Sequence, residues 1–122
     1  MKIYLCSRVK PEYWEQNDRV AKVLEDAGYE VFVPHRVETP GVNPFFHDYK
    51  EMLSTTVCVA VGPFGADCAA EIGWFNGRGI PVIRVIGQGE PRSIQKESPM
   101  VDGFIARHCG IHELLRTLAE LP

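Results

Sequence analysis

Glu71 is the residue in this chain whose type and setting are best suited to chemistry. It lies in the segment GPFGADCAAEIGW at 62–74, directly after the apolar run VCVAV at 57–61. This order predicts a buried strand, a glycine-containing turn and a helix start, which is where open α/β sheets place their active sites. A helix N-terminus favours negative charge, so we expect an ionised Glu71 that can act as a nucleophile or a base.

A second carboxylate, Asp48, falls on an apolar helical stripe. Residues 45–53 are predicted to be helical, with Phe45, Tyr49 and Met52 on one face and Asp48 within that stripe. A carboxylate on a buried stripe costs free energy unless it is hydrogen-bonded or functional. We favour a functional role, because clefts collect perturbed carboxylates. The alternative is that Asp48 braces the proline-rich loop before it.

Other polar groups follow or end the predicted strands. Arg8 and Lys10, or Ser7 with its backbone amides, could hold a phosphate or a carboxylate, although a solvated loop is equally consistent with them. Asp67 either caps the helix that carries Glu71 or contacts the substrate. Tyr4 is a core residue by its alternation in the first strand, and its hydroxyl could still reach the crevice at the strand end.

The histidines give a weaker signal. His35 and Arg36 could stack on a base or hydrogen-bond to it. His108 and His112 flank Cys109 at a spacing that can bind zinc, but no other ligand pair accompanies them, so we interpret them as a surface pair near a helix end. A P-loop and the G-x-G-x-x-G fingerprint are both absent. We therefore expect no cofactor and no metal.

The order of the predicted elements indicates the fold. Strands alternate with helices, which implies a parallel sheet covered on both faces. The strands are expected at 3–7, 29–33, 57–61, 80–86 and 104–106, the helices at 11–28, 45–53, 67–76 and 111–121, and long loops at 34–44 and 87–97. We expect a flavodoxin-like α/β three-layer sandwich of about five strands, whose switch point lies between the first and third strands. Residues 7–10 and 62–67 then face each other across a crevice.

Composition restricts the class of protein. The 122 residues suit one domain spanning 1–122, and 45% hydrophobic with 24% charged residues is ordinary for a globular protein. The net charge of −3 without a basic stripe argues against a nucleic-acid polymer as partner. No apolar run is long enough to span a membrane, and no signal peptide is evident. Four scattered cysteines predict reduced thiols and a cytoplasmic location.

Five segments match a known family in their order and spacing, and together they cover most of the chain. They are KIYLCS at 2–7, GYEVFVP at 28–34, DYKEM at 48–52, EIGW at 71–74 and GIPVI at 79–83. On these segments the chain resembles the nucleoside 2-deoxyribosyltransferase family. The resemblance implies cleavage of the N-glycosidic bond of a (2′-deoxy)nucleoside or its 5′-monophosphate, with the sugar passing to another base or to water.

The resemblance also implies roles for single residues. Glu71 matches the family's nucleophile, in an E-(I/L)-G motif. Asp48 matches the aspartate that binds the sugar and assists proton transfer, and Tyr4 the tyrosine near the nucleophile. Ser98 and Met100 match an (N/S)-x-M motif that a neighbouring subunit donates to the substrate. The resemblance therefore implies a homodimer or a larger homo-oligomer.

Two hints favour one branch of the family, and two positions depart from the family. The serine form of the motif at Ser98 and the Ser7-Arg8 pair resemble 2′-deoxynucleoside 5′-monophosphate N-hydrolases. Thr56 stands where the family often has an aspartate, and Gly65 stands six residues before the nucleophile, where many members carry Asp or Ser. Asp67 could substitute for that group, so we expect Gly65 and Asp67 at the substrate.

Two other functions fit the same fold. A non-catalytic nucleotide-binding module is the main alternative, because a fold does not fix a function. A flavin or phospho-acceptor protein is disfavoured, since Ser7 and Arg8 stand where an acidic cluster would be needed.

Overall fold

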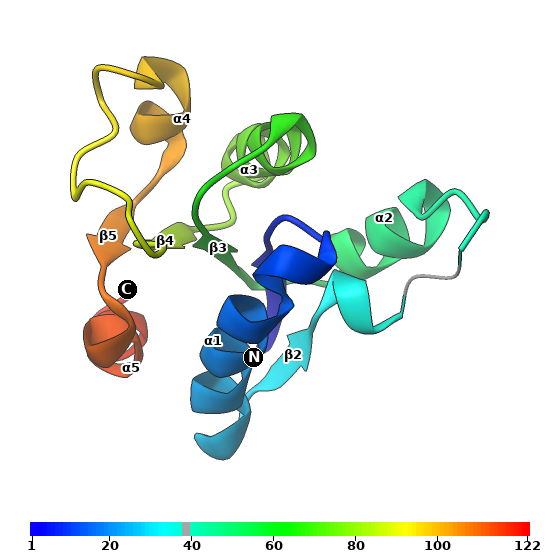
Figure 1. Cartoon of the computed structure of the whole chain (residues 1–122). Helices are drawn as coiled ribbons and strands as arrows, with labels where there is room; N and C mark the ends of the chain where they lie inside the picture. Colours follow the sequence, from blue (N-terminus) through cyan, green and yellow to red (C-terminus); the bar gives the residue numbers. More distant parts are fainter. Residues whose placement is uncertain (38–39) are drawn as a thin grey trace.

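The fold is a five-stranded parallel sheet with helices on both faces (Figure 1). The structure, a computed structural model, describes residues 1–37 and 40–122. The strand order is β2-β1-β3-β4-β5, and every neighbouring pair is parallel. The flavodoxin-like α/β arrangement predicted from the sequence is therefore confirmed, and its switch point lies between β1 and β3.

The elements alternate along the chain as expected. The strands are β1 (Lys2–Cys6), β2 (Glu30–Phe32), β3 (Val57–Val61), β4 (Val82–Val85) and β5 (Arg107–Cys109). The α-helices are α1 (Trp14–Asp26), α2 (Phe45–Leu53), α3 (Ala66–Gly77), α4 (Pro99–Phe104) and α5 (Leu114–Ala119). Short 3-10 turns are η1 (Pro11–Tyr13), η2 (Pro34–Arg36) and η3 (Ile111–Glu113). The predicted loop at 34–44 thus begins with a 3-10 turn, and its residues 38–39 lie outside the described part of the chain.

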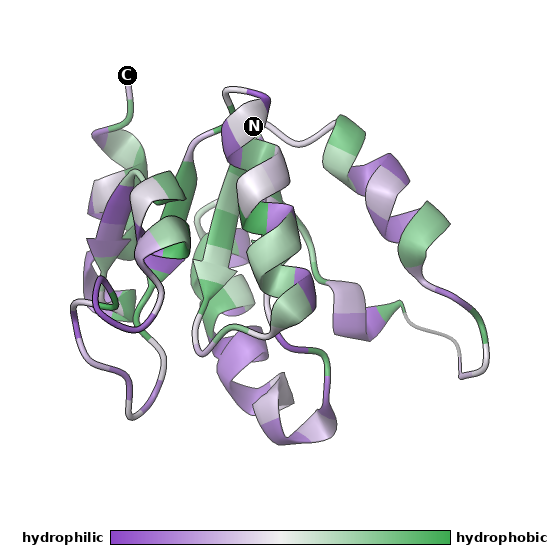
Figure 2. Ribbon diagram, turned by 90° about the horizontal axis from the view of Figure 1, so that it is seen from above, coloured by the Kyte–Doolittle hydropathy of each residue, from purple (hydrophilic) through white to green (hydrophobic). Residues whose placement is uncertain are grey.

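The sheet separates two hydrophobic cores. Alternate strand residues such as Leu5 and Val59 pack under α1 and α5 on one face. Residues of the other parity, such as Tyr4 and Cys58, pack under α2 and α3, where α4 also contributes partly buried side chains. Figure 2 shows the resulting pattern, with hydrophobic strands at the centre of the molecule. This division places Tyr4 on the same side of the sheet as the helices that carry Asp48 and Glu71.

Helix ends follow the local sequence in part. Gly28 has φ +92° just after α1, a backbone conformation that glycine adopts without steric cost. The start of α3 differs from the prediction: Gly65 is its N-cap residue and Asp67 its second residue. Of the two roles left open for Asp67, capping is therefore wrong, because the helix begins two residues earlier, with Gly65 as its N-cap.

The last third of the chain also corrects the sequence analysis. Residues 104–106 do not form the fifth strand; Phe104 ends α4, and the strand follows at 107–109. His108 therefore belongs to β5 and not to a helix surface, and its Nδ1 lies 3.1 Å from Arg84 Nη1. Ser98 followed by Pro99 is typical of a helix start. The apolar run at 104–106 favoured a strand instead, so this helix was not predicted.

All four cysteines are free and buried. Within residues 1–37 and 40–122, no helix is long and apolar enough to cross a membrane.

Candidate active site

A pocket of about 380 Å³ opens at the carboxyl ends of β1 and β3, where the switch point is. Its lining brings together eight of the residues singled out from the sequence. They are Tyr4, Ser7, Arg8, Lys10, Asp48, Gly65, Asp67 and Glu71. These residues come from β1 and the loop after it, from α2, and from the start of α3.

Glu71 lies in the second turn of α3, and β1 holds both of its carboxylate oxygens. The Tyr4 hydroxyl donates a short hydrogen bond to Oε2. The Cys6 thiol lies 3.8 Å from Oε1. Tyr4 and Cys6 are two residues apart on one strand, so both project from the same face of the sheet. Residues of β1 therefore contact both carboxylate oxygens, one through a strong donor and the other through a weak donor.

Burial raises the pKa of Glu71 to about 7. The hydrogen bonds from Tyr4 and Cys6 favour the charged form, whereas the nearby carboxylates Asp48 and Asp67 oppose it. The expectation that the helix N-terminus keeps Glu71 fully ionised is therefore wrong at neutral pH. Glu71 sits five residues beyond the start of the helix, where the macrodipole has weakened and desolvation dominates.

Tyr4 itself is fixed by packing. It is fully buried, and its ring lies edge-on to Phe32 at 5.4 Å and tilted against Phe75 at 5.3 Å. Burial and the adjacent Glu71 raise the pKa of its hydroxyl far above the usual value. Tyr4 therefore stays protonated and acts as a permanent hydrogen-bond donor to the carboxylate.

Asp48 faces the pocket from α2. Its side chain is 20% exposed, and its Oδ1 is 3.9 Å from Nδ1 of His47. It is close enough to Glu71 for its charge to raise the pKa of that residue. Two carboxylates from different helices therefore share one pocket, an arrangement that suits a nucleophile and a proton-transfer group.

The far end of the pocket has unused hydrogen-bonding capacity. Ser7 Oγ and Arg8 Nε are buried and have no hydrogen-bond partner among the described residues. Arg8 is held in place by Nη2, which donates to the Phe64 carbonyl at 2.9 Å, and by Nη1, which donates to Tyr13 Oη at 3.2 Å. These groups lie beside the N-terminus of α3, which favours anions.

Gly65 and Asp67 border this end. A Cβ on Gly65 would lie 3.6 Å from Arg8 Nε, an ordinary contact, so the structure leaves room for a side chain there. Asp67 is exposed at the rim. Arg8 thus lies beside the position at which a side chain at 65 would project.

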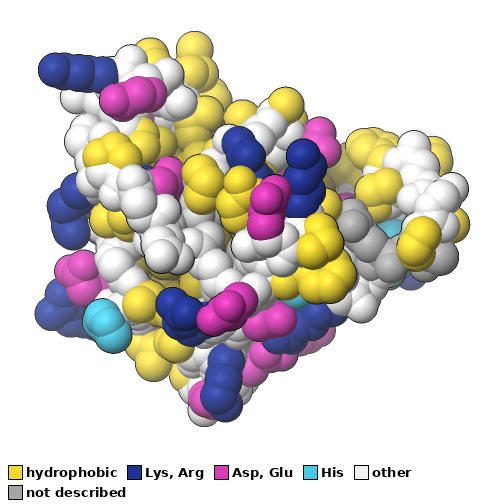
Figure 3. All heavy atoms as spheres, viewed as in Figure 1, with side chains coloured by type: hydrophobic (Ala, Val, Ile, Leu, Met, Phe, Trp, Pro, Cys, Tyr) yellow, Lys and Arg dark blue, Asp and Glu magenta, His cyan; other side chains and the backbone are white. Residues whose placement is uncertain are grey.

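Aromatic side chains extend from the pocket across α2. Tyr49 lies 5.5 Å from Phe45 in a stacked arrangement and 5.7 Å from Trp74 edge-on. Phe45 and Phe46 are 55% and 77% exposed, and hydrophobic side chains gather over this helix in Figure 3. Phe45 and Phe46 therefore face outward from the molecule.

Three predicted site residues lie elsewhere. His35 Nε2 pairs with Asp18 at 3.1 Å, and its ring stacks on Trp14, so within this chain it is engaged outside the pocket. Ser98 precedes α4, and Met100 on that helix is 69% exposed. Neither Ser98 nor Met100 lines the pocket of its own chain.

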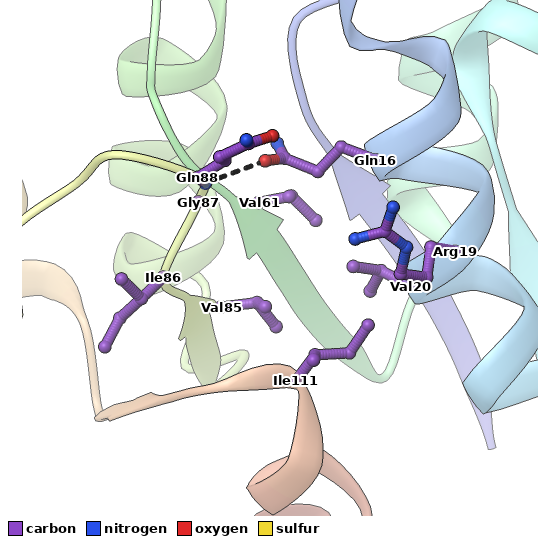
Figure 4. A pocket seen from close by; sticks show the side chains of 9 residues that line it. All are labelled: Gln16, Arg19, Val20, Val61, Val85, Ile86, Gly87, Gln88 and Ile111. Atoms are coloured by element: carbon purple, nitrogen blue, oxygen red, sulfur yellow. Dashed lines mark hydrogen bonds between the residues drawn. The ribbon is translucent and has the colours of Figure 1, made fainter.

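A second crevice lies on the opposite face of the sheet, between α1 and η3 (Figure 4). It measures about 290 Å³, and its floor is apolar, with Val20, Val61 and Ile111. The side-chain amide of Gln16 at its edge already makes two hydrogen bonds within the protein, since it donates to the Gly62 carbonyl and accepts from Gln88 N. None of the predicted site residues lines this crevice, so the candidate active site is the pocket at Glu71.

Sequence reasoning missed two cysteines beside Glu71, Cys6 and Cys68. Cys6 was predicted only to be a reduced thiol, yet it contacts Glu71. Cys68 lines the pocket directly. A signal was present for Cys6, since it shares strand parity with Tyr4. For Cys68 the helical spacing of three from Glu71 placed both on one face.

The fold occurs in solved proteins. A 2-deoxyribosyltransferase from Bacillus psychrosaccharolyticus matches with a TM-score of 0.76 and 22% identity, over 93% of this chain and 90% of that one. A conserved protein from Enterococcus faecalis gives 0.77 and 16%, over 98% of both chains. The Clostridium botulinum CMP N-glycosidase BcmB gives 0.64 and 18%, also over 98% of both. No protein-family model matches the chain, and no curated protein matches its sequence.

The structural matches agree with the resemblance found in the sequence, because they include a protein of the very activity that names the family. This chain therefore has the fold shared by a solved 2-deoxyribosyltransferase and a solved CMP N-glycosidase.

Proposed function

We propose that this protein cleaves the N-glycosidic bond of (2′-deoxy)nucleosides or their 5′-monophosphates. The observation that carries the proposal is the placement of Glu71, a half-buried carboxylate held by Tyr4 in a pocket that it shares with Asp48. Two of the structural neighbours are a 2-deoxyribosyltransferase and a CMP N-glycosidase, and both names denote chemistry at an N-glycosidic bond.

The proposed reaction has two displacements at C1′. In the first, a Glu71 oxygen forms a bond to C1′ while the bond from C1′ to the base nitrogen breaks. The electron pair leaves with the base, and Asp48 assists the transfer of a proton to it. Positive charge develops on the sugar in the transition state, which the nearby carboxylate stabilises. In the second, another base or water attacks C1′ and releases Glu71.

The raised pKa of Glu71 suits this role. A carboxylate of higher basicity is a better nucleophile once ionised, and a pKa of about 7 leaves about half of the protein in the reactive form at neutral pH. The buried Tyr4 hydroxyl fixes one oxygen. This pre-orientation reduces the entropy that must be lost to reach the transition state.

We further propose that a 5′-phosphate binds at the Ser7–Arg8 end of the pocket. The unpartnered Ser7 Oγ and Arg8 Nε support this, together with the N-terminus of α3. Because Ser98 lies away from the pocket of its own chain, it can meet a substrate only across a subunit contact, and we propose a homodimer or larger assembly in which it does so.

The test is incubation with a panel of deoxynucleosides, ribonucleosides and their 5′-monophosphates, with chromatography of the free base. Addition of a second base separates transfer from hydrolysis. We expect base release by the unaltered protein and its loss in Glu71→Gln. The matched control is Glu12→Gln, which makes the same change at an exposed carboxylate outside the pocket and retains cleavage.

Base release by Glu71→Gln at the rate of the unaltered protein would refute the role of Glu71. Nucleotide binding without cleavage would instead support a non-catalytic nucleotide-binding module.

A further inference from the structure

The carboxylate of Glu71 has two hydrogen-bond donors of unequal strength, and only one of them belongs to the chemistry described above. Tyr4 donates to Oε2. The other donor is the Cys6 thiol, 3.8 Å from Oε1 and fully buried. A thiol is a weak donor, so this contact holds Oε1 without tying up its lone pairs.

The Cys6 proton has a second acceptor. The carbonyl oxygen of Cys68 lies 3.6 Å from the sulfur. The thiol can therefore turn between a neutral carbonyl and the carboxylate, depending on whether Glu71 carries its charge. The thiol stays protonated, because its contact with the neighbouring Cys58 thiol and its burial both raise the pKa of Cys6. Cys6 is thus available as a donor across the working pH range.

We propose that the Cys6 thiol is a positioning residue for Glu71, donating to Oε1 when the carboxylate is ionised, opposite the Tyr4 hydroxyl on Oε2. This inference rests on the proposed function for its catalytic meaning. When Oε1 becomes the ester oxygen of a glycosyl-enzyme, it is a poorer acceptor, and the thiol proton returns to the Cys68 carbonyl. The weak donor therefore supports the anion and does not obstruct its attack on C1′.

The surroundings of Glu71 define what must be held constant in a test. Tyr4 and Cys6 face it from β1, Asp48 from α2, and Asp67 from its own helix. The two carboxylates raise the pKa of Glu71, and the two donors lower it. Removal of Cys6 alone leaves the other three groups in place.

The test is a titration of Glu71 in the free protein, by carbon-13 NMR of labelled glutamate carboxyl groups. The signal is assigned by its loss in Glu71→Gln. We expect Cys6→Ala to raise the pKa of Glu71 by about 0.5 pH units, the equivalent of one weak hydrogen bond. Cys6→Ser keeps a proton donor at the position, so the pKa stays at or below that of the unaltered protein.

The matched control is Cys109→Ala. Cys109 is also buried, but it lies in the core on the other face of the sheet. Its truncation removes the same atoms without altering the surroundings of Cys6, so the pKa of Glu71 is expected to stay unchanged. An unchanged pKa in Cys6→Ala, or an equal rise in Cys109→Ala or Cys6→Ser, would overturn the proposal.

Activity provides a separate measurement. The acid limb of kcat/KM is expected to move upward with the NMR value in Cys6→Ala, whereas a purely structural defect would lower the rate at every pH. If no nucleoside or nucleotide is cleaved, the proposed function fails, while the titration still decides the role of Cys6.

Discussion

Glu71 is expected to make the protein less stable and more active as the pH rises from 5 to 8. The perturbation that isolates this effect is Glu71→Gln, which keeps the size of the side chain and removes its charge. Glutamine can still accept the hydrogen bond that Tyr4 donates in the unaltered protein. The comparison therefore measures the cost of the buried charge with little loss of packing.

The sign follows from proton linkage. The pKa of Glu71 is raised from its usual 4.5 to about 7 in the folded protein. Between these values the folded state binds more protons than the unfolded state, so stability falls as the pH rises. The stabilisation is fully present below pH 4.5 and is lost as the pH passes through about 7. Between pH 5 and 8 the loss amounts to about 2.5 kcal/mol.

The assay is urea denaturation of both proteins at several pH values. Between pH 5 and 8, the free energy of unfolding of Glu71→Gln is expected to rise by about 2.5 kcal/mol relative to that of the unaltered protein. Glu12→Gln, which neutralises an exposed carboxylate, serves as the control and should follow the unaltered protein. Parallel curves for Glu71→Gln and the unaltered protein would refute the burial argument.

The same ionisation predicts the opposite trend in activity. A nucleophile with a pKa of about 7 is about 9% ionised at pH 6 and about 91% at pH 8. The value of kcat/KM is therefore expected to rise about tenfold over this range. A flat profile would show that ionised Glu71 is not required.

Four further predictions follow from the site. Tyr4→Phe removes the donor on Oε2, so the acid limb of kcat/KM should move upward by about 1 pH unit or more. Asp48→Asn should lower kcat by about 100-fold with nucleosides whose base must be protonated to leave, measured by base release. Arg8→Ala should weaken the binding of 5′-monophosphates by about 10-fold or more and leave nucleosides little changed, measured by calorimetry. A mixture of the Glu71→Gln and Ser98→Ala proteins should recover monophosphate cleavage after subunit exchange, because one site of each mixed dimer would then be intact. The absence of recovery would contradict the proposal that Ser98 reaches the site of the neighbouring subunit.

Much of the fold was predictable because it depends on hydrophobic patterning. The run at 57–61 is buried at every position and forms β3 as predicted, and α2 spans 45–53 as its apolar stripe indicated. The last strand was misplaced by three residues. β5 is an edge strand with two polar residues, so hydrophobic patterning did not distinguish it from the end of α4.

The residues that line the candidate pocket were predictable to a similar degree. Strand order alone placed the loops after β1 and β3 on one crevice, and Asp48 was expected there from its unusual place on an apolar stripe. The state of Glu71 was not predictable, because the pKa depends on burial that only the folded chain provides. The contact of Cys6 with Glu71 is likewise a tertiary feature. His35 was predicted to be a site residue but lies outside the pocket. Its partner Asp18 belongs to α1, so this pairing could not be predicted from the sequence of the loop.

Arg84, to which the sequence analysis assigned no role, supports the turn that precedes the helix carrying Glu71. Arg84 on β4 is fully buried, donates to the carbonyls of Pro91 and Arg92, and lies 3.5 Å from Glu90. The Glu90 carboxylate in turn packs against Gly62, where an added Cβ would lie only 1.7 Å from Oε1. A buried charge of this kind is stable only when paired and hydrogen-bonded.

A side chain added at position 62 would therefore displace the Glu90 carboxylate from this contact. At this position the backbone of the turn between β3 and α3 contacts the carboxylate of Glu90, which lies in the loop after β4. Glu90 also accepts a hydrogen bond from Gly87 N. The start of α3, and with it the direction of Glu71, is therefore fixed on one side by Tyr4 and on the other by this buried ion pair. The polar loop at 87–97 thus packs against the turn that leads to the helix carrying Glu71.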